Sequence, residues 1–409
     1  MTKILDGIRV IDFTTGHMGT FATMLLADYG AEVIKIEDPA VGGDSLRYTY
    51  PKNEDGSAYH AYLNRGKKSI CIDRHTEKGQ ELLKKLINTA DVVCDCFVSG
   101  ELEMCHLGYD EMSIVNPRII YASQTGFGKY GPMATNSGVD LTSEALAGLM
   151  QITGYPDTGP TAHGSRMADQ FGGVHLAAGI CCALIAREDS GQGQVVEVAS
   201  ADSMLTALED TIAAASLKGK SFHREGNGSR AIAPYDVFEV KDGIIATAIS
   251  TNSQWNNFLT AMNMEYLHDD PRFANNESRG VYYYTEEGNP NGLHELLTEA
   301  FLRMTKKECN DLFSPLNIPS GPGLTVAEAY EDEQLKARNM VLEIKDKAIG
   351  PIKMMGMPIK ITGVDDMDFT SAPLLGENTA EYLKTVGVDV KTMQALVSEN
   401  VIRFHGGDE

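Results

Sequence analysis

Asp169 combines a reactive side chain with a position that could activate it. It lies in residues 163–188 (HGSRMADQFGGVHLAAGICCALIARE), where a polar segment gives way to small and apolar residues. Leu176, Ile180 and Leu184 recur at three- to four-residue spacing, which predicts a helix that starts near Asp169. Unpaired N–H groups and the helix dipole favour a carboxylate there. Asp169 is therefore either an N-cap or a nucleophile that the same N–H groups keep ionised, and position alone does not separate the two.

Composition and charge narrow the class of protein. At 409 residues the chain is too long for one ordinary core, so two domains are expected. Its 43% hydrophobic and 22% charged residues are ordinary for a soluble globular protein. The net charge of −22 argues against nucleic acid or an anionic membrane as a partner. An anionic substrate would need a local basic cluster.

The seven cysteines are odd in number and scattered along the chain. They indicate reduced thiols in a cytoplasm rather than a disulfide framework. The chain has neither a Cys-x-x-Cys pair nor a His-Glu-x-x-His motif, so no metal site is predicted. The N-terminus has no signal-peptide apolar core, and we find no run of about 18 apolar residues suited to a membrane span. We expect a soluble, cytoplasmic protein.

Strands and helices alternate in the first part of the chain. Strand-like runs are predicted at 8–13, 33–36, 92–97 and 119–121, with helices at 21–30 and 77–88. This alternation predicts an α/β fold with a parallel sheet and right-handed crossovers. Further elements are a strand at 195–198, a helix at 203–217, a hairpin at 235–249 that turns at Lys241–Gly243, and strands near 352 and 359–361. A change of composition over roughly 225–325 indicates a second, smaller domain.

A dinucleotide site is the obvious alternative for such a fold. Its Gly-x-Gly-x-x-Gly motif should occupy the first strand–helix turn. The literal match, Gly126, Gly128 and Gly131, lies elsewhere and is followed by Pro132 and a polar stretch that opens no good helix. We therefore reject a nicotinamide or flavin site.

Several stretches taken together resemble the class III coenzyme A-transferases. This is the CaiB/BaiF family, which includes the formyl-CoA:oxalate and carnitine CoA-transferases. The resemblance runs in order from about residue 5 to 400 and is nearest to the oxalate-type branch. The stretches that carry it are LDGIRVIDFT, LLADYGAEVIKIE, LNRGKKSICID, NPRIIYASQTGFGKYGP, GLMQITGYPDTGP, MADQFGGVHLAAGI, APYDVFEVKDG, ARNM and APLLGENTAEYL.

The resemblance implies an interlocked homodimer. Each chain would have a Rossmann-like large domain, with a parallel sheet built from both chain ends, and a smaller α+β middle domain. The expected parts are 1–224 (large domain, CoA binding and nucleophile), 225–325 (small domain) and 326–409 (large domain). The implied substrates are an acyl-CoA and a small carboxylic acid, and no metal or organic cofactor is implied.

The family nucleophile is an Asp in an A-D-x-x-x-G stretch, which falls on Ala168-Asp169. The resemblance therefore favours Asp169 as the nucleophile over a pure N-cap. It implies attack on the thioester to give a mixed anhydride and CoA thiolate, and then an aspartyl-CoA thioester. The incoming acid displaces that thioester, and the same thiolate resolves the second anhydride.

Other roles carry over position by position. His17, in the first strand–helix turn, and Asp140, beside the nucleophile, complete the predicted catalytic set. Seven residues are expected to contact CoA or cover the intermediates: Asn64, Arg65, Lys67, Lys68, Phe97, Gly226 and Gly228. The basic stretch at 64–68 is expected to hold phosphates, its alternative being a solvated basic turn. The loop at 226–229 is less glycine-rich than a tight lid requires.

Two departures from the family pattern bear on the adenosine end of CoA. Asp38 stands where an Arg is common, and Cys96–Gly100, followed by Glu101 and Glu103, replaces Asn-Phe-x-Pro-Gly. Both remove expected phosphate contacts, so we expect a different mode of binding there. Arg47 is the candidate replacement cation.

The alternatives are a racemase and a CoA-binding protein without turnover. The α-methylacyl-CoA racemases share the fold but need a His in a Gly-His-Asp stretch, and this chain has Gly138-Val139-Asp140. Valine cannot transfer a proton. A CoA-binding protein without turnover would have lost the nucleophile, which is present. The sequence does not identify the acceptor acid, which is oxalate, another dicarboxylate, a hydroxy acid or a carnitine-like acid.

Overall fold

A computed structural model describes residues 3–219, 224–229, 232–281, 283, 292–364 and 369–406. The chain forms two compact units: unit 1 comprises Met1–Met150, Ala162–Ser221 and Ala337–Glu409, and unit 2 comprises Gln151–Thr161 and Phe222–Lys336. The predicted domains placed 151–161 in the large domain and ended the small one at 325.

Hydrogen bonds and an ion pair explain both differences. The Gly226 N–H donates to the Gly154 carbonyl at 2.9 Å, and Arg224 Nε donates to the Thr158 carbonyl at 3.0 Å. These bonds attach 151–161 to unit 2. Lys306 pairs with Glu328 at 3.0 Å, which keeps the segment after residue 325 in the same unit.

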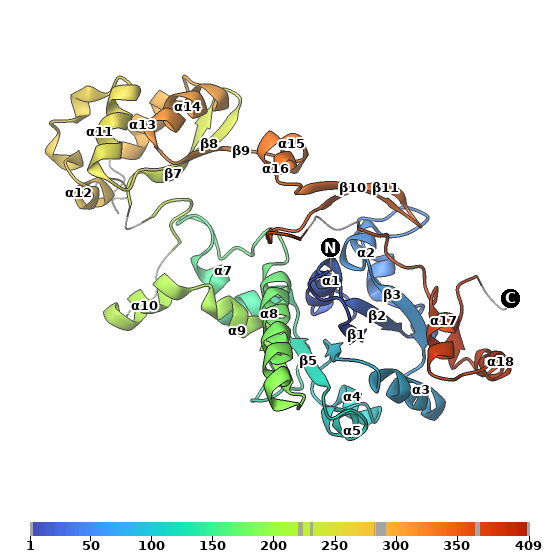
Figure 1. The fold of residues 1–409 in the computed structure, drawn as a ribbon. Coiled ribbons are helices and arrows are strands. Elements are labelled where there is room, and N and C mark those ends of the chain that lie inside the picture. The colour runs from blue at the N-terminus through green and yellow to red at the C-terminus, as the bar shows by residue number, and fades with distance from the viewer. Residues whose placement is uncertain are drawn as a thin grey trace. The chain divides into compact units, whose positions relative to one another are not determined.

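Unit 1 contains a seven-stranded sheet in the order β12-β3-β2-β1-β4-β5-β6. All neighbours pair in parallel except β12, which is antiparallel to β3. The predicted α/β fold with a parallel sheet is thus confirmed, and β12 with α17 brings the C-terminal segment beside β3 (Figure 1). The strands are β1 (Arg9–Asp12), β2 (Glu32–Glu37), β3 (Lys68–Ile72), β4 (Val92–Asp95), β5 (Ile120–Thr125), β6 (Val195–Ala199) and β12 (Ile402–Arg403).

Helices cover both faces of this sheet because successive strand residues point to opposite sides. Val10 packs in a core with α1 and α8, whereas Ile11 packs in a core with α3, α5, α17 and α18. The longer helices of unit 1 are α1 (Thr20–Asp28), α2 (Ala58–Leu63), α3 (Glu77–Ile87), α5 (Tyr109–Val115), α6 (Asp140–Ala147), α8 (Met167–Ser190), α9 (Ser200–Thr206), α10 (Glu209–Lys218), α17 (Thr379–Thr385) and α18 (Val390–Ser398). Unit 1 also contains the short helix α4 (Glu101–Met104) and the hairpin of β10 (Val341–Asp346) and β11 (Gly350–Met355), and the short helix α7 (Leu149–Ile152) crosses the boundary between the units. The single helix predicted at 203–217 is two helices, and 359–361 is not a strand.

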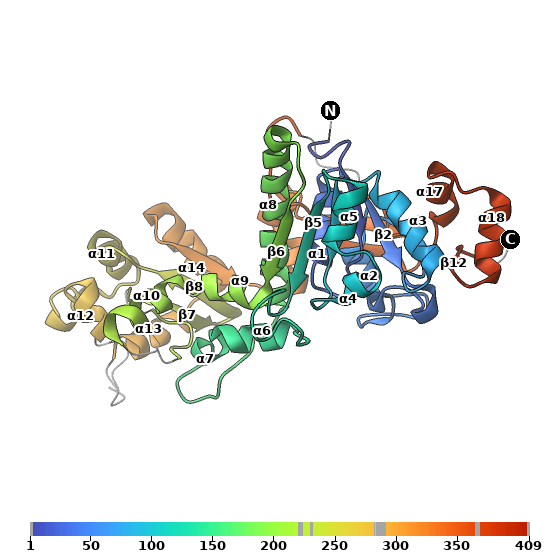
Figure 2. The ribbon, with the colours of Figure 1, turned by 90° about the horizontal axis from the view of Figure 1, so that it is seen from below.

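Helix α8 lies along β5 and β6 (Figure 2) and also packs on α1. In the described chain it is the one helix long and apolar enough, by length and composition alone, to cross a membrane. The prediction that no such run exists is therefore wrong. Half of its most apolar window is buried in the protein. The close packing needs Gly173, because a Cβ there would lie 3.1 Å from Phe21 Cβ and 3.2 Å from the Ala22 nitrogen.

Unit 2 is built on an antiparallel sheet of β7 (Tyr235–Val240), β8 (Gly243–Ala248) and β9 (Ser320–Gly323). The β7–β8 pairing confirms the predicted hairpin. Stacked rings fill the core, with Phe238 and Phe301 centroids 4.5 Å apart. Its helices are α11 (Asn252–Ala261), α12 (Asn276–Val281), α13 (Leu293–Phe301), α14 (Lys306–Phe313) and α15 (Val326–Glu331), and α16 (Glu333–Ala337) ends at the boundary.

Lys67, predicted to hold a CoA phosphate, is part of the core of unit 1. Its side chain is buried, and Nζ donates to Asp12 Oδ2 at 3.0 Å and to Thr23 Oγ1 at 2.8 Å. It also donates at 3.1 Å to Oδ1 of Asn64, which is fully buried. The sequence prediction assumed that these side chains reach solvent, and for both residues this is wrong.

Arg65 is also internal. It forms a bidentate ion pair with Asp28, at 2.9 and 2.5 Å, and its guanidinium lies over the rings of Tyr62 and Phe369. Its charge is compensated inside unit 1, so the expected cluster of phosphate ligands is corrected here too. Lys68 is the exposed residue of this stretch, and its binding of a CoA phosphate stays a prediction.

The neighbouring lysines offer a matched test of this correction. We expect Lys67→Met to lower the free energy of unfolding by about 3–5 kcal/mol, because it leaves the Asp12 carboxylate buried without its cation. Lys68→Met should change it by less than about 0.5 kcal/mol, since Lys68 is on the surface. Urea unfolding of both variants measures the difference, and equal effects would contradict the buried ion pair.

Candidate active site

Asp169 lies in the first turn of α8 but does not cap it. The helix begins at Met167, Arg166 is the N-cap, and no side-chain cap bond is present there. The backbone N–H of Asp169 donates to Asp140 Oδ1 at 3.0 Å. The N-cap interpretation is therefore wrong, and the structure brings together Asp169 and Asp140.

The Asp169 carboxyl is buried, and its Oδ1 has no hydrogen-bond partner among the residues that the structure describes. Burial raises the pKa of Asp169 to about 7, the Asp140 carboxylate adds to the rise, and Arg166 opposes it. The prediction that helix N–H groups keep the carboxylate ionised is corrected, because those groups do not reach Oδ1. A partly desolvated carboxylate that still ionises near neutral pH suits a nucleophile.

Gln124, near the end of β5, positions Asp169. Its Nε2 donates to the Asp169 carbonyl and to Ser200 Oγ, both at 3.0 Å, and its Oε1 accepts the Gly19 N–H at 2.9 Å. A Cβ on Gly172 would overlap the Gln124 amide, so that position has to be glycine for this approach. No motif in the sequence marks Gln124; the adjacent glycines of α8 are the only sign of a close approach there.

His17 lies in the loop between β1 and α1, 4.5 Å from the ring of Tyr59 on α2. Burial, together with the positive charge of Arg166, lowers the pKa of His17 to about 4. The imidazole is thus neutral at neutral pH. Its Nε2 is buried with no partner in the described part of the chain, which leaves it free to meet a ligand.

Tyr59 joins this group although the sequence analysis did not single it out. Burial raises the pKa of Tyr59 and the charge of Asp169 adds to the rise, whereas the nearby positive charge of Arg166 lowers it. Tyr59 and Arg166 are therefore neighbours of both predicted catalytic residues, His17 and Asp169. Local sequence around Tyr59 shows no motif that would have identified it.

Glu144 adds a further acidic group. It lies one turn after Asp140 on α6, and its side chain is fully buried. Oε2 accepts the His163 N–H at 3.0 Å, and Oε1 has no hydrogen-bond partner within the described ranges. Its charge adds to the rise in the Asp169 pKa. The four-residue spacing from Asp140, which places both residues on one face of a helix, is the sequence feature that could have identified Glu144.

The cluster of Asp169, Asp140, Glu144, His17, Tyr59 and Arg166 belongs entirely to unit 1. It gathers near the carboxyl ends of β1 and β5, where ligands bind in open parallel sheets. It offers a carboxylate with a free oxygen, a neutral imidazole with a free nitrogen, a phenol and a guanidinium. Such a set can perform acyl transfer through a covalent carboxylate intermediate.

The residues linked to the adenosine end of CoA are arranged around Arg74. Its guanidinium lies 4.6 Å from the ring centre of Phe97, which is half-buried after β4, and NH2 donates to Glu101 at 3.1 Å. Arg47 is bound to Glu37 at 2.8 and 2.6 Å, so the prediction that it replaces a lost phosphate contact is corrected.

Asp38, Asp73 and His75 present three potential metal-ligand atoms within 4.8 Å of one another. Both carboxylates also cap local turns: Asp38 Oδ1 accepts the Ala40 N–H at 2.8 Å and Asp73 Oδ1 the His75 N–H at 2.8 Å. The Arg74 guanidinium, 3.9 Å from Asp38, provides a countercharge. Local structure therefore accounts for this cluster.

Gly226 and Gly228 lie in unit 2. Gly226 has a φ of 66°, and a Cβ there would lie 2.6 Å from the Tyr155 ring, so the turn requires glycine. Asn227 Nδ2 donates to Tyr155 Oη at 3.0 Å. These contacts attach the loop to residues 151–161 of the same unit.

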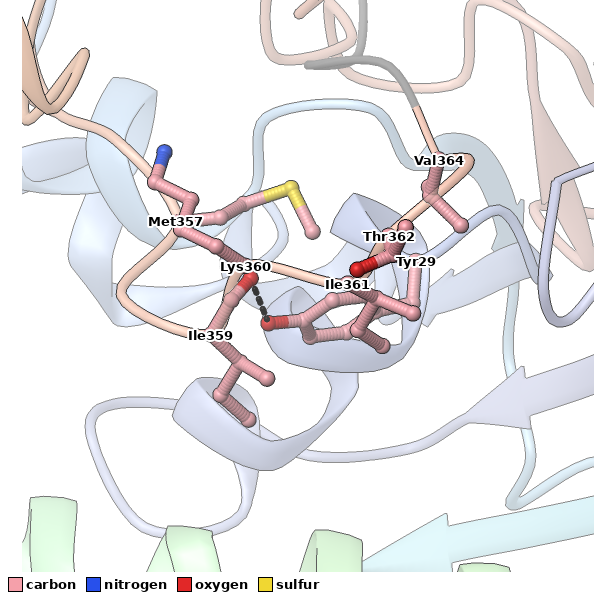
Figure 3. A pocket seen from close by; sticks show the side chains of 7 residues that line it. All are labelled: Tyr29, Met357, Ile359, Lys360, Ile361, Thr362 and Val364. Atoms are coloured by element: carbon pink, nitrogen blue, oxygen red, sulfur yellow. Dashed lines mark hydrogen bonds between the residues drawn. The ribbon is translucent and has the colours of Figure 1, made fainter.

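A pocket of about 380 Å³ lies in unit 1 beside Tyr29, whose hydroxyl donates to the Ile359 carbonyl at 3.4 Å (Figure 3). Its lining residues are Tyr29, Met357, Ile359, Lys360, Ile361, Thr362 and Val364. None of them belongs to the Asp169 cluster, and the lining contains no carboxylate, imidazole or thiol. We therefore place the candidate site at Asp169.

The raised pKa of Asp169 makes a prediction about stability. The folded protein holds this proton more tightly than the unfolded chain, so ionisation between about pH 4 and pH 7 destabilises the fold, by about 4 kcal/mol at most. Asp169→Asn cannot ionise. Its free energy of unfolding, relative to the wild type, should therefore increase between pH 5 and pH 8. Urea unfolding at both pH values measures this, with exposed Asp202→Asn as the control; a difference independent of pH would contradict it.

The sequence of this chain was compared with protein families and with curated proteins. Residues 5–379 match CoA-transferase family III. The acetyl-CoA:oxalate CoA-transferase of Acetobacter aceti is 35% identical over 93% of this chain and 95% of its own length. The succinyl-CoA:mesaconate CoA-transferase of Haloarcula hispanica is 35% identical over 95% of this chain and 98% of its own.

A solved structure supports the same assignment. A CAIB/BAIF family protein from Brucella suis superposes with a TM-score of 0.83 at 33% identity, covering 94% of this chain and all of that one. The match therefore extends to the fold as well as the sequence. The chain belongs to CoA-transferase family III and is a CoA-transferase.

Proposed function

We propose that this enzyme moves CoA from an acyl-CoA to a small carboxylic acid through covalent intermediates on Asp169. The observation that carries the proposal is the buried Asp169 carboxyl, whose Oδ1 has no hydrogen-bond partner in the described residues. The oxalate and mesaconate acceptors named for two relatives support a small acid as acceptor.

In the first step an Asp169 oxygen attacks the thioester carbonyl. A C–O bond forms and the C–S bond breaks, giving a mixed anhydride and CoA thiolate. We assign His17 to the developing oxyanion: its imidazole is neutral, and Nε2 has an unused hydrogen-bonding position if it carries the proton. Asp140 holds the Asp169 backbone through the N–H bond at 3.0 Å.

The thiolate then attacks the aspartyl carbonyl of the anhydride, releasing the donor acid and leaving an aspartyl-CoA thioester. The acceptor carboxylate displaces the thiolate to form a second anhydride. Attack of the same thiolate on the acceptor carbonyl yields the new acyl-CoA and regenerates Asp169. The thioester energy is conserved, so the proposed cycle needs no metal or organic cofactor.

We assign CoA contacts to exposed Lys68, to Phe97 and to the loop carrying Gly226 and Gly228. Asn64, Arg65 and Lys67 are reassigned to the fold, because all three side chains are buried and the charges of Arg65 and Lys67 are compensated. All seven cysteines are free thiols, which supports the proposed cytoplasmic location.

Mass spectrometry tests the mechanism directly. The enzyme is incubated with a panel of acyl-CoAs without acceptor, and the peptide containing Asp169 is examined. We expect a CoA- or acyl-sized adduct that one particular carboxylate removes, and that forms faster at pH 8 than at pH 6 because more Asp169 is ionised.

Asp169→Asn should abolish the adduct while CoA binding is retained, and Asp202→Asn on the surface of α9 should form it normally. An adduct that persists in Asp169→Asn would remove Asp169 from the mechanism. Absence of any adduct, together with exchange of the α-proton in deuterated water, would support the racemase alternative instead.

We further propose that the enzyme is a homodimer of interlocked chains. Helix α10 has no buried residue, and its Leu217 is 88% exposed. Ile185 on α8 is 72% exposed and Val174 is 46% exposed. Apolar side chains repeated along two helices are typical of a surface that a partner covers. A second copy of the chain accounts for them.

Analytical ultracentrifugation tests this proposal. The wild type should sediment as a dimer, and Ile185→Asp with Leu217→Asp should increase the monomer fraction at least about tenfold, because charges would be buried at the interface. The control is Ile114→Asp, at an exposed position of α5, which should leave the dimer intact. A stable wild-type monomer would overturn the proposal.

A further inference from the structure

The charges of the active site differ in their access to solvent. Asp169 and Asp140 are 4% and 9% exposed, and Glu144 is fully buried. Arg166 is exposed. Three carboxylates are thus held inside unit 1 while the guanidinium next to them faces outward. An acid that arrives from solution meets the cation first.

Arg166 is fixed close to the reacting group. It is the N-cap residue of α8, three positions before Asp169, so the helix start sets the separation between the two. Its positive charge lowers the pKa of both Tyr59 and His17, whose rings lie 4.5 Å apart. The N–H groups of a guanidinium form a planar fork that matches a carboxylate.

Bringing an acid to this site has an electrostatic cost. A carboxylate placed near Asp169, Asp140 and Glu144 is repelled by like charge, and this repulsion is stronger in a partly buried site than in bulk water. The acid needs a countercharge that does not neutralise the attacking oxygen, because a carboxylate bound by a guanidinium is a weaker nucleophile. One group on the acid must therefore bind Arg166 while another attacks.

We propose that Arg166 binds the second carboxylate of the acceptor and selects dicarboxylic acids over monocarboxylic acids. The inference rests on the proposed transfer through Asp169 and names its substrate class. One carboxylate attacks the aspartyl-CoA carbonyl, and the other pairs with Arg166 near Tyr59. A carnitine-like acceptor is disfavoured, because its ammonium group would face a guanidinium.

The test compares acids of equal length with acetyl-CoA as donor, since the acetyl group has no second carboxylate. The acceptor pairs are malonate and propionate, succinate and butyrate, and glutarate and valerate. For the pair with the highest turnover, wild-type kcat/KM should favour the dicarboxylate at least about tenfold. Arg166→Gln should reduce that ratio at least about tenfold, and Arg166→Lys should reduce it less, because the charge remains but the fork is lost.

Arg118→Gln is the matched control. Arg118 is an exposed arginine of unit 1 paired with Glu188 on the surface, and its loss should leave the ratio unchanged. Formation of the Asp169 adduct from acetyl-CoA checks that each variant is folded. If Arg166→Gln does not fold, Arg166→Lys still tests the proposal, because its ratio of dicarboxylate to monocarboxylate kcat/KM should also fall.

The outcomes separate the two proposals. A ratio that falls in Arg166→Gln but not in Arg118→Gln supports the inference. Equal losses for both acids, no change, or a wild type that prefers the monocarboxylate overturns it while the transfer mechanism stands. If the wild type forms no Asp169 adduct with any donor, the proposed mechanism fails and this inference fails with it.

Discussion

The hydrogen bonds of Gln124 hold the candidate site together. One buried amide reaches the Gly19 turn before α1, the Asp169 carbonyl in α8 and Ser200 at the start of α9. An amide can do this because it carries both a donor and an acceptor end. The helix must approach closely, which Gly172 permits. Without this approach Asp169 would not lie at the edge of the sheet.

The same approach buries acidic groups at a cost to stability. Asp169, Asp140 and Glu144 lie together, and the pKa of Asp169 rises to about 7 as a result. A carboxyl stabilised by several N–H groups would ionise more readily but would be a poorer nucleophile. The fold thus holds Asp169 at a cost to stability, an arrangement that is common at active sites.

The basic stretch before β3 shows the opposite use of charge. Lys67 pairs with Asp12 and Arg65 pairs with Asp28 inside unit 1. In a chain with a net charge of −22, these two cations were expected to bind an anionic ligand, but their charges are neutralised by the fold. Buried pairs of this kind hold the chain in one arrangement because separating the partners is costly. The exposed charges that remain for an anionic ligand are fewer than the sequence suggests.

The sequence alone determined the α/β class, the parallel pairing of the first strands and the unit 2 hairpin, and it pointed to Asp169 as the candidate nucleophile. Alternation, turn residues and a motif around one aspartate are local properties, so they can be recognised along the chain. Three features depended on tertiary structure: the burial of Lys67, the grouping of Tyr59, His17 and Arg166, and the upward shift of the Asp169 pKa. Each depends on which distant segments pack together and exclude water, and no local pattern encodes that.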